Sequence, residues 1–87
     1  MSLEEQIAAR PLHLPGLILI PGYEIVVKDS RGSVVKGVFV GYASSFIALA
    51  ASCESRRPVR FLNIRRVNEI IVLGRCEYGG GENSVED

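Results

Sequence analysis

Hydrophobic and polar residues alternate along the segment from Tyr23 to Lys28, with Tyr23, Ile25 and Val27 on one face. A period of two is typical of a half-buried strand. The segment that follows, Asp29–Gly32, has the composition of a tight turn, because aspartate can bond its own backbone and glycine accepts a positive φ. The pattern therefore predicts a strand and an immediate antiparallel return.

The returning segment, Ser33 to Tyr42, is long and apolar, and Gly37 and Gly41 interrupt it. Glycines within a strand allow the backbone to bend or to approach a neighbour closely. Three further strands are expected, with room for a single helical turn before the last: Ser45–Ala51, Val59–Ile64 and Glu69–Leu73. The chain is therefore predicted to be mainly β and to form a strongly bent, five-stranded antiparallel small barrel.

A short helix is expected before this barrel. Ser2 and Glu5 have the spacing of a capping box, in which each side chain satisfies a backbone amide at a helix start. The helix would run from Leu3 to about Arg10, where Pro11 ends it. Its apolar side would lie across the open end of the barrel.

The chain length of 87 residues indicates a single domain. The apolar pattern stops after Leu73, and residues 74–87 are rich in glycine and acidic residues. That composition predicts a disordered tail, so the domain is expected to span residues 1–73, helix included. An apolar fraction of 47% is high for so small a monomer, and apolar strands at an open edge pair with other chains. We therefore expect a homo-oligomer.

Ten basic and ten acidic residues cancel, so any affinity for nucleic acid depends on how the charges are arranged. The segment from Ser55 to Arg66 contains no acid and five arginines, which are the predicted nucleic-acid-binding residues: Arg56, Arg57, Arg60, Arg65 and Arg66. A guanidinium group binds phosphate through two parallel hydrogen bonds and stacks on bases. The alternative is that some of these arginines pair with Glu54 or Glu69 and the others lie in solvent.

Cysteine and histidine are scarce. Cys53, Cys76 and His13 are too few for a zinc site with four protein ligands, and the cysteines lack Cys-x-x-Cys spacing. We expect no metal and no other cofactor. No nucleophile or orienting carboxylate stands at a recognisable spacing from His13, so we do not expect an enzyme.

The sequence shows no secretory leader, so the two cysteines are expected to be reduced thiols in a cytoplasmic protein, with a disulfide between them as the alternative. The apolar run from Leu17 to Ile20 is too short to cross a bilayer. We therefore expect a soluble protein that makes no contact with a membrane.

The predicted order of elements, from about Leu3 to Leu73, resembles that of the Sm and Sm-like (Lsm) proteins. The residues that carry the first motif of the family are Tyr23, Ile25, Val27, Lys28, Asp29, Gly32, Gly37, Phe39, Gly41 and Tyr42; the second motif resembles Ile64, Arg65, Val67 and Ile70. The resemblance implies six- or seven-membered rings in which strand four of one subunit pairs with strand five of the next. It would make Val59–Ile64 and Glu69–Leu73 subunit edges, and it implies binding of uridine- or adenine-rich RNA.

The chain departs from the family in the residues that read uridine. Ala43 and Ile47 stand where the family usually has an aspartate and an asparagine, and Arg65-Arg66 replaces Arg-Gly. Only Arg65 of the usual base pocket is present, so the pocket is expected to be degenerate.

Two hypotheses follow from this departure. The first is a ring-forming RNA-binding protein of RNA processing or turnover, in which arginines contact the RNA backbone with low sequence specificity. The second is an oligomeric scaffold that binds protein partners and has lost RNA binding, which Ala43 and Ile47 favour.

Overall fold

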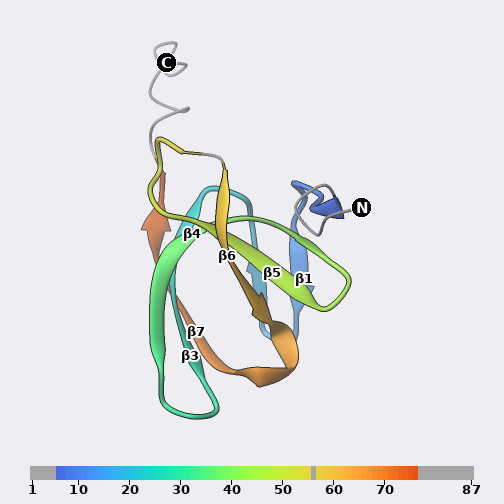
Figure 1. The fold of residues 1–87 in the computed structure, drawn as a ribbon, viewed down its shortest axis with the longest axis vertical. Coiled ribbons are helices and arrows are strands. Elements are labelled where there is room, and N and C mark those ends of the chain that lie inside the picture. The colour runs from blue at the N-terminus through green and yellow to red at the C-terminus, as the bar shows by residue number, and fades with distance from the viewer. Residues whose placement is uncertain (1–5, 56, 77–87) are drawn as a thin grey trace.

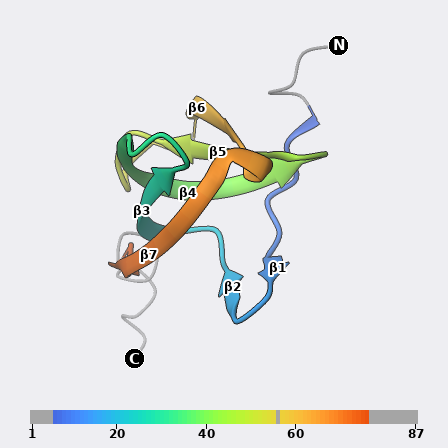
Figure 2. The ribbon, with the colours of Figure 1, turned by 90° about the horizontal axis from the view of Figure 1, so that it is seen from below.

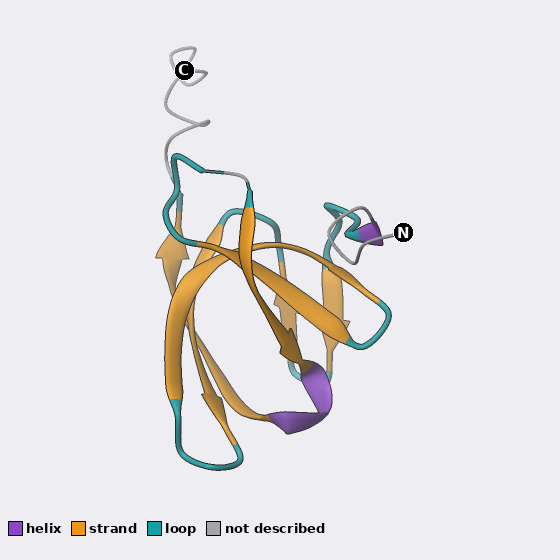
Figure 3. Cartoon of the chain, in the orientation of Figure 1, coloured by secondary structure: helices purple, strands orange, loops and turns teal. Residues whose placement is uncertain are grey.

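The structure, a computed structural model, describes residues 6–55 and 57–76 (Figure 1). Its elements in chain order are β1 (Leu12–Leu14), β2 (Leu17–Leu19), β3 (Tyr23–Asp29), β4 (Val34–Ala43), β5 (Phe46–Ala50), β6 (Pro58–Asn63), the 3₁₀ turn η1 (Ile64–Arg66) and β7 (Val67–Arg75). The chain is mainly β (Figure 3), and the five strands expected from the sequence pattern correspond to β3–β7.

The five long strands form one antiparallel sheet in the order β6-β5-β4-β3-β7. Strand β3 pairs on both sides, so that Val27 lies opposite Val35 of β4 and Ile70 of β7. The period of two in β3 places Ile25 and Val27 in the core, where both side chains are buried. The tight turn predicted after β3 is present, since the Gly32 amide donates to the Asp29 carbonyl oxygen over 3.0 Å.

The prediction of a closed barrel is wrong, because the sheet is open. Strand β6 pairs with β5 and β7 pairs with β3, and among the described residues no ladder joins β6 to β7. The expected bend is present: the register of β4 against β5 shifts between Phe39 and Gly41. It does not close the sheet, because η1 redirects the chain and β7 adds to the outer edge of β3 instead of returning along β6.

The prediction of an N-terminal helix is also wrong for the residues that the structure describes. The helical conformation does not continue past Gln6, and Ala8 instead pairs with Tyr42 through two backbone hydrogen bonds of 3.0 and 3.2 Å. This crossing needs Gly41, where a methyl group would collide with the Ala8 carbonyl oxygen and with Ile7. The long-range backbone pairing therefore overrides the local capping signal.

A β-hairpin takes the place that the helix was expected to fill. Strands β1 and β2 form a separate two-stranded sheet beside the main one (Figure 2). They are joined by Pro15 and Gly16, whose φ of 79° suits glycine. The leucines of this hairpin face the core, and Leu19 is fully buried. His13 and Ile18 lie opposite each other on the exposed face of the hairpin.

The core lies between this hairpin and one face of the bent sheet. Its buried cluster consists of Leu19, Ile25, Val27, Phe39, Ile47 and Leu49. Gly37 allows β4 and β5 to approach closely, since a methyl group there would come within 3.0 Å of the Leu49 side chain. The glycine pattern of β4 is thus explained by packing and by the crossing at Gly41.

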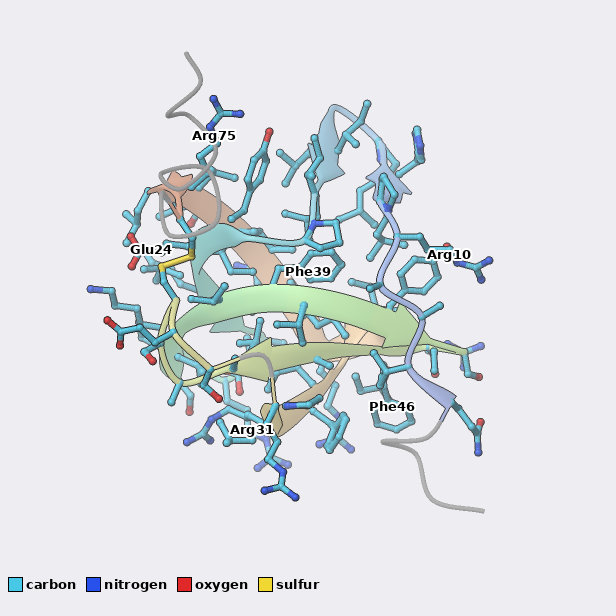
Figure 4. The ribbon with its side chains drawn as sticks, turned by 90° about the horizontal axis from the view of Figure 1, so that it is seen from above. Arg10, Glu24, Arg31, Phe39, Phe46 and Arg75 are labelled. Atoms are coloured by element: carbon cyan, nitrogen blue, oxygen red, sulfur yellow. A yellow bond between two sulfur atoms is a disulfide. The ribbon has the colours of Figure 1, made fainter. Side chains whose placement is uncertain are left out.

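The two cysteines form a disulfide, which corrects the expectation of reduced thiols. Cys53 lies in the loop between β5 and β6, and Cys76 directly follows β7, with 5.5 Å between their Cα atoms (Figure 4). The Cys76 amide also donates to the Gly22 carbonyl oxygen over 2.7 Å. Residues 74–76, which were expected to begin the tail, therefore belong to the folded unit; residues 77–87 lie outside the described residues.

Strand β7 thus follows β6 through η1 at one end, and at the other end the disulfide links the residue after β7 to the loop between β5 and β6. Within residues 6–55 and 57–76, no helix has the length and apolar character that crossing a bilayer requires.

Candidate nucleic-acid interface

The predicted arginines do not form one cluster. Arg57 precedes β6, Arg60 lies within it, and Arg65 and Arg66 belong to η1, while Arg56 lies outside the described residues. Strand β6 has six residues, so its two ends are roughly 20 Å apart. The four described arginines are all exposed, and the structure brings only Arg65 and Arg66 together.

Arg60 is placed by the register of the sheet. It lies opposite Leu49, whose side chain is in the core. Because directly opposite residues of an antiparallel pair share a face, Arg60 lies on the core-facing side of an edge strand. We therefore leave Arg60 out of the candidate interface.

The turn η1 presents Arg65 and Arg66 from a fixed backbone. The Asn63 Oδ1 atom accepts a hydrogen bond of 2.9 Å from the Arg65 amide and so caps the turn. The Ile64 amide donates to the Ser45 carbonyl oxygen over 2.8 Å, which attaches η1 to the turn between β4 and β5. Both guanidinium groups thus project from a short, anchored segment.

The structure adds an arginine that the sequence reasoning missed. The Asp29 Oδ1 atom accepts hydrogen bonds of 2.9 and 2.8 Å from the amides of Arg31 and Ser33, which fixes the turn between β3 and β4. The Ser30 amide donates to the Arg66 carbonyl oxygen over 2.9 Å. Arg31 therefore lies near η1, and we call Arg31, Arg65 and Arg66 the basic end of the sheet.

A cavity of about 410 Å³ opens at the basic end. Four of its lining residues are polar: Asp29, Ser33, Asn63 and Arg66. Two aromatic residues, Phe46 and Phe61, also line it. Figure 4 shows Arg31 and Phe46 on one side of β4 and β5, with Phe39 of the core on the other. An aromatic wall beside free hydrogen-bonding groups is an arrangement that suits an unpaired base.

The alternative that some arginines pair with Glu54 or Glu69 stays open, but Glu69 has another partner among the described residues. Glu69 lies 3.7 Å from the Lys28 Nζ atom across β3 and β7, and both side chains are about half exposed. An exposed pair of this kind contributes little to stability. Because Glu69 lies beside Lys28, it makes no ion pair with Arg65 or Arg66.

The positions that would read uridine in Sm-like proteins face the core. Ile47 is 1% exposed and belongs to the core cluster, and Ala43 is 7% exposed. Neither residue can present a polar group to a ligand. The guanidinium group of Arg10 lies 5.0 Å from the ring centre of the neighbouring Tyr42. This cation–π contact involves a different arginine from those of the basic end.

Among residues 6–55 and 57–76, no group of three or more histidine, cysteine, aspartate or glutamate side chains could hold a metal ion. No model of a protein family, no curated protein and no solved structure matches the chain. The functional proposal therefore depends on the geometry of the basic end.

Proposed function

We propose that the protein binds single-stranded RNA at the basic end, in RNA processing or turnover. The observation that carries this proposal is the hydrogen bond from Ser30 to Arg66, because it brings the turn between β3 and β4 to η1. Arg66 then lines a cavity with an aromatic wall, and the exposed Arg31 and Arg65 belong to the two segments that meet beside it. Arginine forks bind phosphates, and aromatic rings stack on unpaired bases.

Backbone contacts would dominate this binding. Contacts between arginine and phosphate carry no sequence information. Ala43 and Ile47, at the positions that read uridine in Sm-like proteins, have no polar side-chain group that could read a base. Ile47 lies in the core, so an amide that reads the uracil edge is missing. We therefore propose RNA binding that does not follow the uridine recognition of the Sm-like proteins.

Self-association would strengthen the positive field of a neutral chain. We propose that the free edge of β6 in one copy pairs with the free edge of β7 in the next, which is a head-to-tail contact that closes into a ring. Both edges carry exposed apolar residues: Val59 is 61% exposed on β6, and Leu73 is 52% exposed on β7. Six or seven copies, as the resemblance implies, would multiply the basic end by symmetry.

The proposal is tested by the affinity for a fluorescent single-stranded RNA, measured by anisotropy over a range of salt concentrations. Removing Arg65 and Arg66 together (R65A/R66A) should weaken binding by at least about tenfold and lower the salt slope by about two. The matched control, K36A/R75A, removes the same charge from exposed residues outside the basic end. Equal losses in the two variants, or no binding by the wild type, would refute the proposal.

The second candidate, an oligomeric scaffold for protein partners, is favoured by apolar side chains that the fold leaves exposed. Ile71, Val72 and Leu73 follow one another on β7, and Ile18 and Ile20 are exposed near β2. Consecutive exposed apolar residues on an edge strand mark an association surface. A wild-type protein with the mass of an oligomer and no affinity for RNA would establish this candidate instead.

The compartment belongs to the same proposal. RNA as the ligand favours the cytoplasm, whereas a disulfide is typical of oxidising compartments. We keep the cytoplasm as the proposed location. Subcellular fractionation tests it: the proposal predicts that the full chain is recovered with the cytosolic fraction, and recovery from an oxidising compartment would contradict it.

A further inference from the structure

The cavity at the basic end holds hydrogen-bonding groups that the fold does not use. The Asp29 Oδ1 atom accepts two backbone hydrogen bonds, whereas its Oδ2 atom accepts none from the described residues. Asn63 uses Oδ1 to cap η1, and its Nδ2 group donates to no described residue. The Arg66 side chain makes no ion pair with a described residue. The cavity thus offers one carboxylate acceptor and two sets of donors.

These groups stand beside flat apolar surfaces. Phe46 and Phe61 line the same cavity, whose volume of about 410 Å³ exceeds that of one nucleobase. A ligand that uses all of these features is planar and carries both acceptors and N–H donors on its rim. Aromatic stacking would hold its faces, and the polar groups would select among its edges.

We infer that this cavity binds guanine. Guanine presents the acceptors O6 and N7 on one edge, which suit the two donors of an arginine fork, here Arg66. Its N1–H and N2–H groups are donors, which suit the free Oδ2 atom of Asp29. Adenine carries an amino group where guanine has O6, so it would place donors against Arg66. Uracil has a single N–H between two carbonyl oxygens on this edge. These oxygens would face the Asp29 carboxylate and be repelled by it.

The inference rests on the proposed function in so far as the guanine belongs to RNA. The same base chemistry is found in free guanine nucleotides, so the experiment needs separate arms for the two sources. It uses the full chain, short uridine-rich RNAs with a single central guanosine, adenosine or inosine, and guanosine monophosphate alone.

The decisive variant is D29N. Asparagine keeps an Oδ1 atom that can accept the hydrogen bonds of the Arg31 and Ser33 amides, so the turn should be preserved. It replaces the free acceptor by a donor, which opposes the guanine N–H groups. E54Q is the matched control, because Glu54 is exposed and does not line the cavity. If D29N fails to fold, R66Q with R75Q as its control tests the opposite edge of the base.

We expect the guanosine RNA to bind about tenfold more tightly than the adenosine RNA, with inosine between them because it lacks the N2 amino group. D29N should remove this preference and E54Q should keep it. RNA binding with equal affinity for all central bases, or a preference that survives in D29N and R66Q, overturns the inference and leaves the proposed function standing. Binding of guanosine monophosphate without RNA binding overturns the proposed function and keeps the guanine site. Binding of neither overturns both.

Discussion

The two ends of β7 are attached to the rest of the sheet by different means. At the η1 end, three residues join β6 and β7 directly, and the turn is capped by Asn63 and attached to Ser45 by hydrogen bonds. At the other end, a disulfide joins Cys53 and Cys76, which are 23 positions apart in the sequence. Local polar contacts therefore hold the chain at one end of the sheet, and a covalent bond holds it at the other.

The two ends also differ in the chemistry of their cavities. The cavity at the η1 end has Asp29 and Arg66 in its lining. A smaller cavity of about 260 Å³ lies at the disulfide end; the described residues that line it carry no charge and include Val38 and Val40 beside both cysteines. We propose that the disulfide end contributes stability, whereas the η1 end presents the groups that can select a ligand.

The largest expected effect concerns the free edges that run between the two ends. Lysine on an edge strand prevents pairing with another strand, so V59K should disable the β6 edge and L73K the β7 edge. Each variant alone should be a monomer by native mass. An equimolar mixture should form a dimer, because one intact β6 edge then meets one intact β7 edge.

This experiment separates head-to-tail assembly from other forms of association. A symmetric dimer through β7 alone would be unaffected by V59K. A mixture that stays monomeric, or a single variant that keeps the wild-type mass, contradicts the proposed pairing.

Removal of the disulfide should destabilise the chain by about 3 kcal/mol, as expected when a cross-link between residues 23 positions apart is lost from the unfolded state. The change is C53S/C76S, and the measurement is the free energy of unfolding in urea. Wild type in reducing buffer is the control and should match the variant. If the two ends are as distinct as we propose, the RNA affinity of the folded variant should be unchanged; a parallel loss of affinity would contradict the division.

Loss of the cap on η1 should have a smaller effect on stability. N63A removes the acceptor of the Arg65 amide and should cost about 1 kcal/mol in the free energy of unfolding. N63D keeps an acceptor and should restore most of this loss. Because the cap lies at the η1 end, N63A should also weaken RNA binding, which C53S/C76S should not do. An N63A variant with wild-type affinity would show that η1 does not need its cap to bind.

Much of the sheet could be predicted because its signals are local. The alternation in Tyr23–Lys28 and the turn at Asp29–Gly32 depend on neighbouring residues, and β3 and its hairpin with β4 follow from them. The glycines of β4 marked the bend, and the positions of β6 and β7 at the sheet edges agree with the segments that the resemblance assigned to subunit edges. Their role between subunits stays a prediction.

The features that were wrong or missed depend on contacts between distant residues. The capping-box spacing favoured a helix, but the pairing of Ala8 with Tyr42 over Gly41 took precedence. The hairpin of β1 and β2, the open sheet and the disulfide likewise depend on where the chain returns in space.

The candidate site was predicted only in part for the same reason. Arg65 and Arg66 are neighbours in sequence, whereas Arg31 joins them through the contact of Ser30 with Arg66. The acceptor of Asp29 and the aromatic wall become visible only when the cavity is assembled. The density of arginines also suggested Arg57 and Arg60. Arg57 is separated from the basic end by the length of β6, and Arg60 lies within that strand on its core-facing side.

Amide hydrogen exchange, measured by mass spectrometry with and without a single-stranded RNA, tests most directly which end of the sheet recognises the ligand. We predict that RNA slows exchange in residues 29–33 and 63–67 and leaves residues 51–55 and 74–76 at the disulfide end unchanged. Slowed exchange confined to the disulfide end, or no change at either end at saturating RNA, would contradict the account.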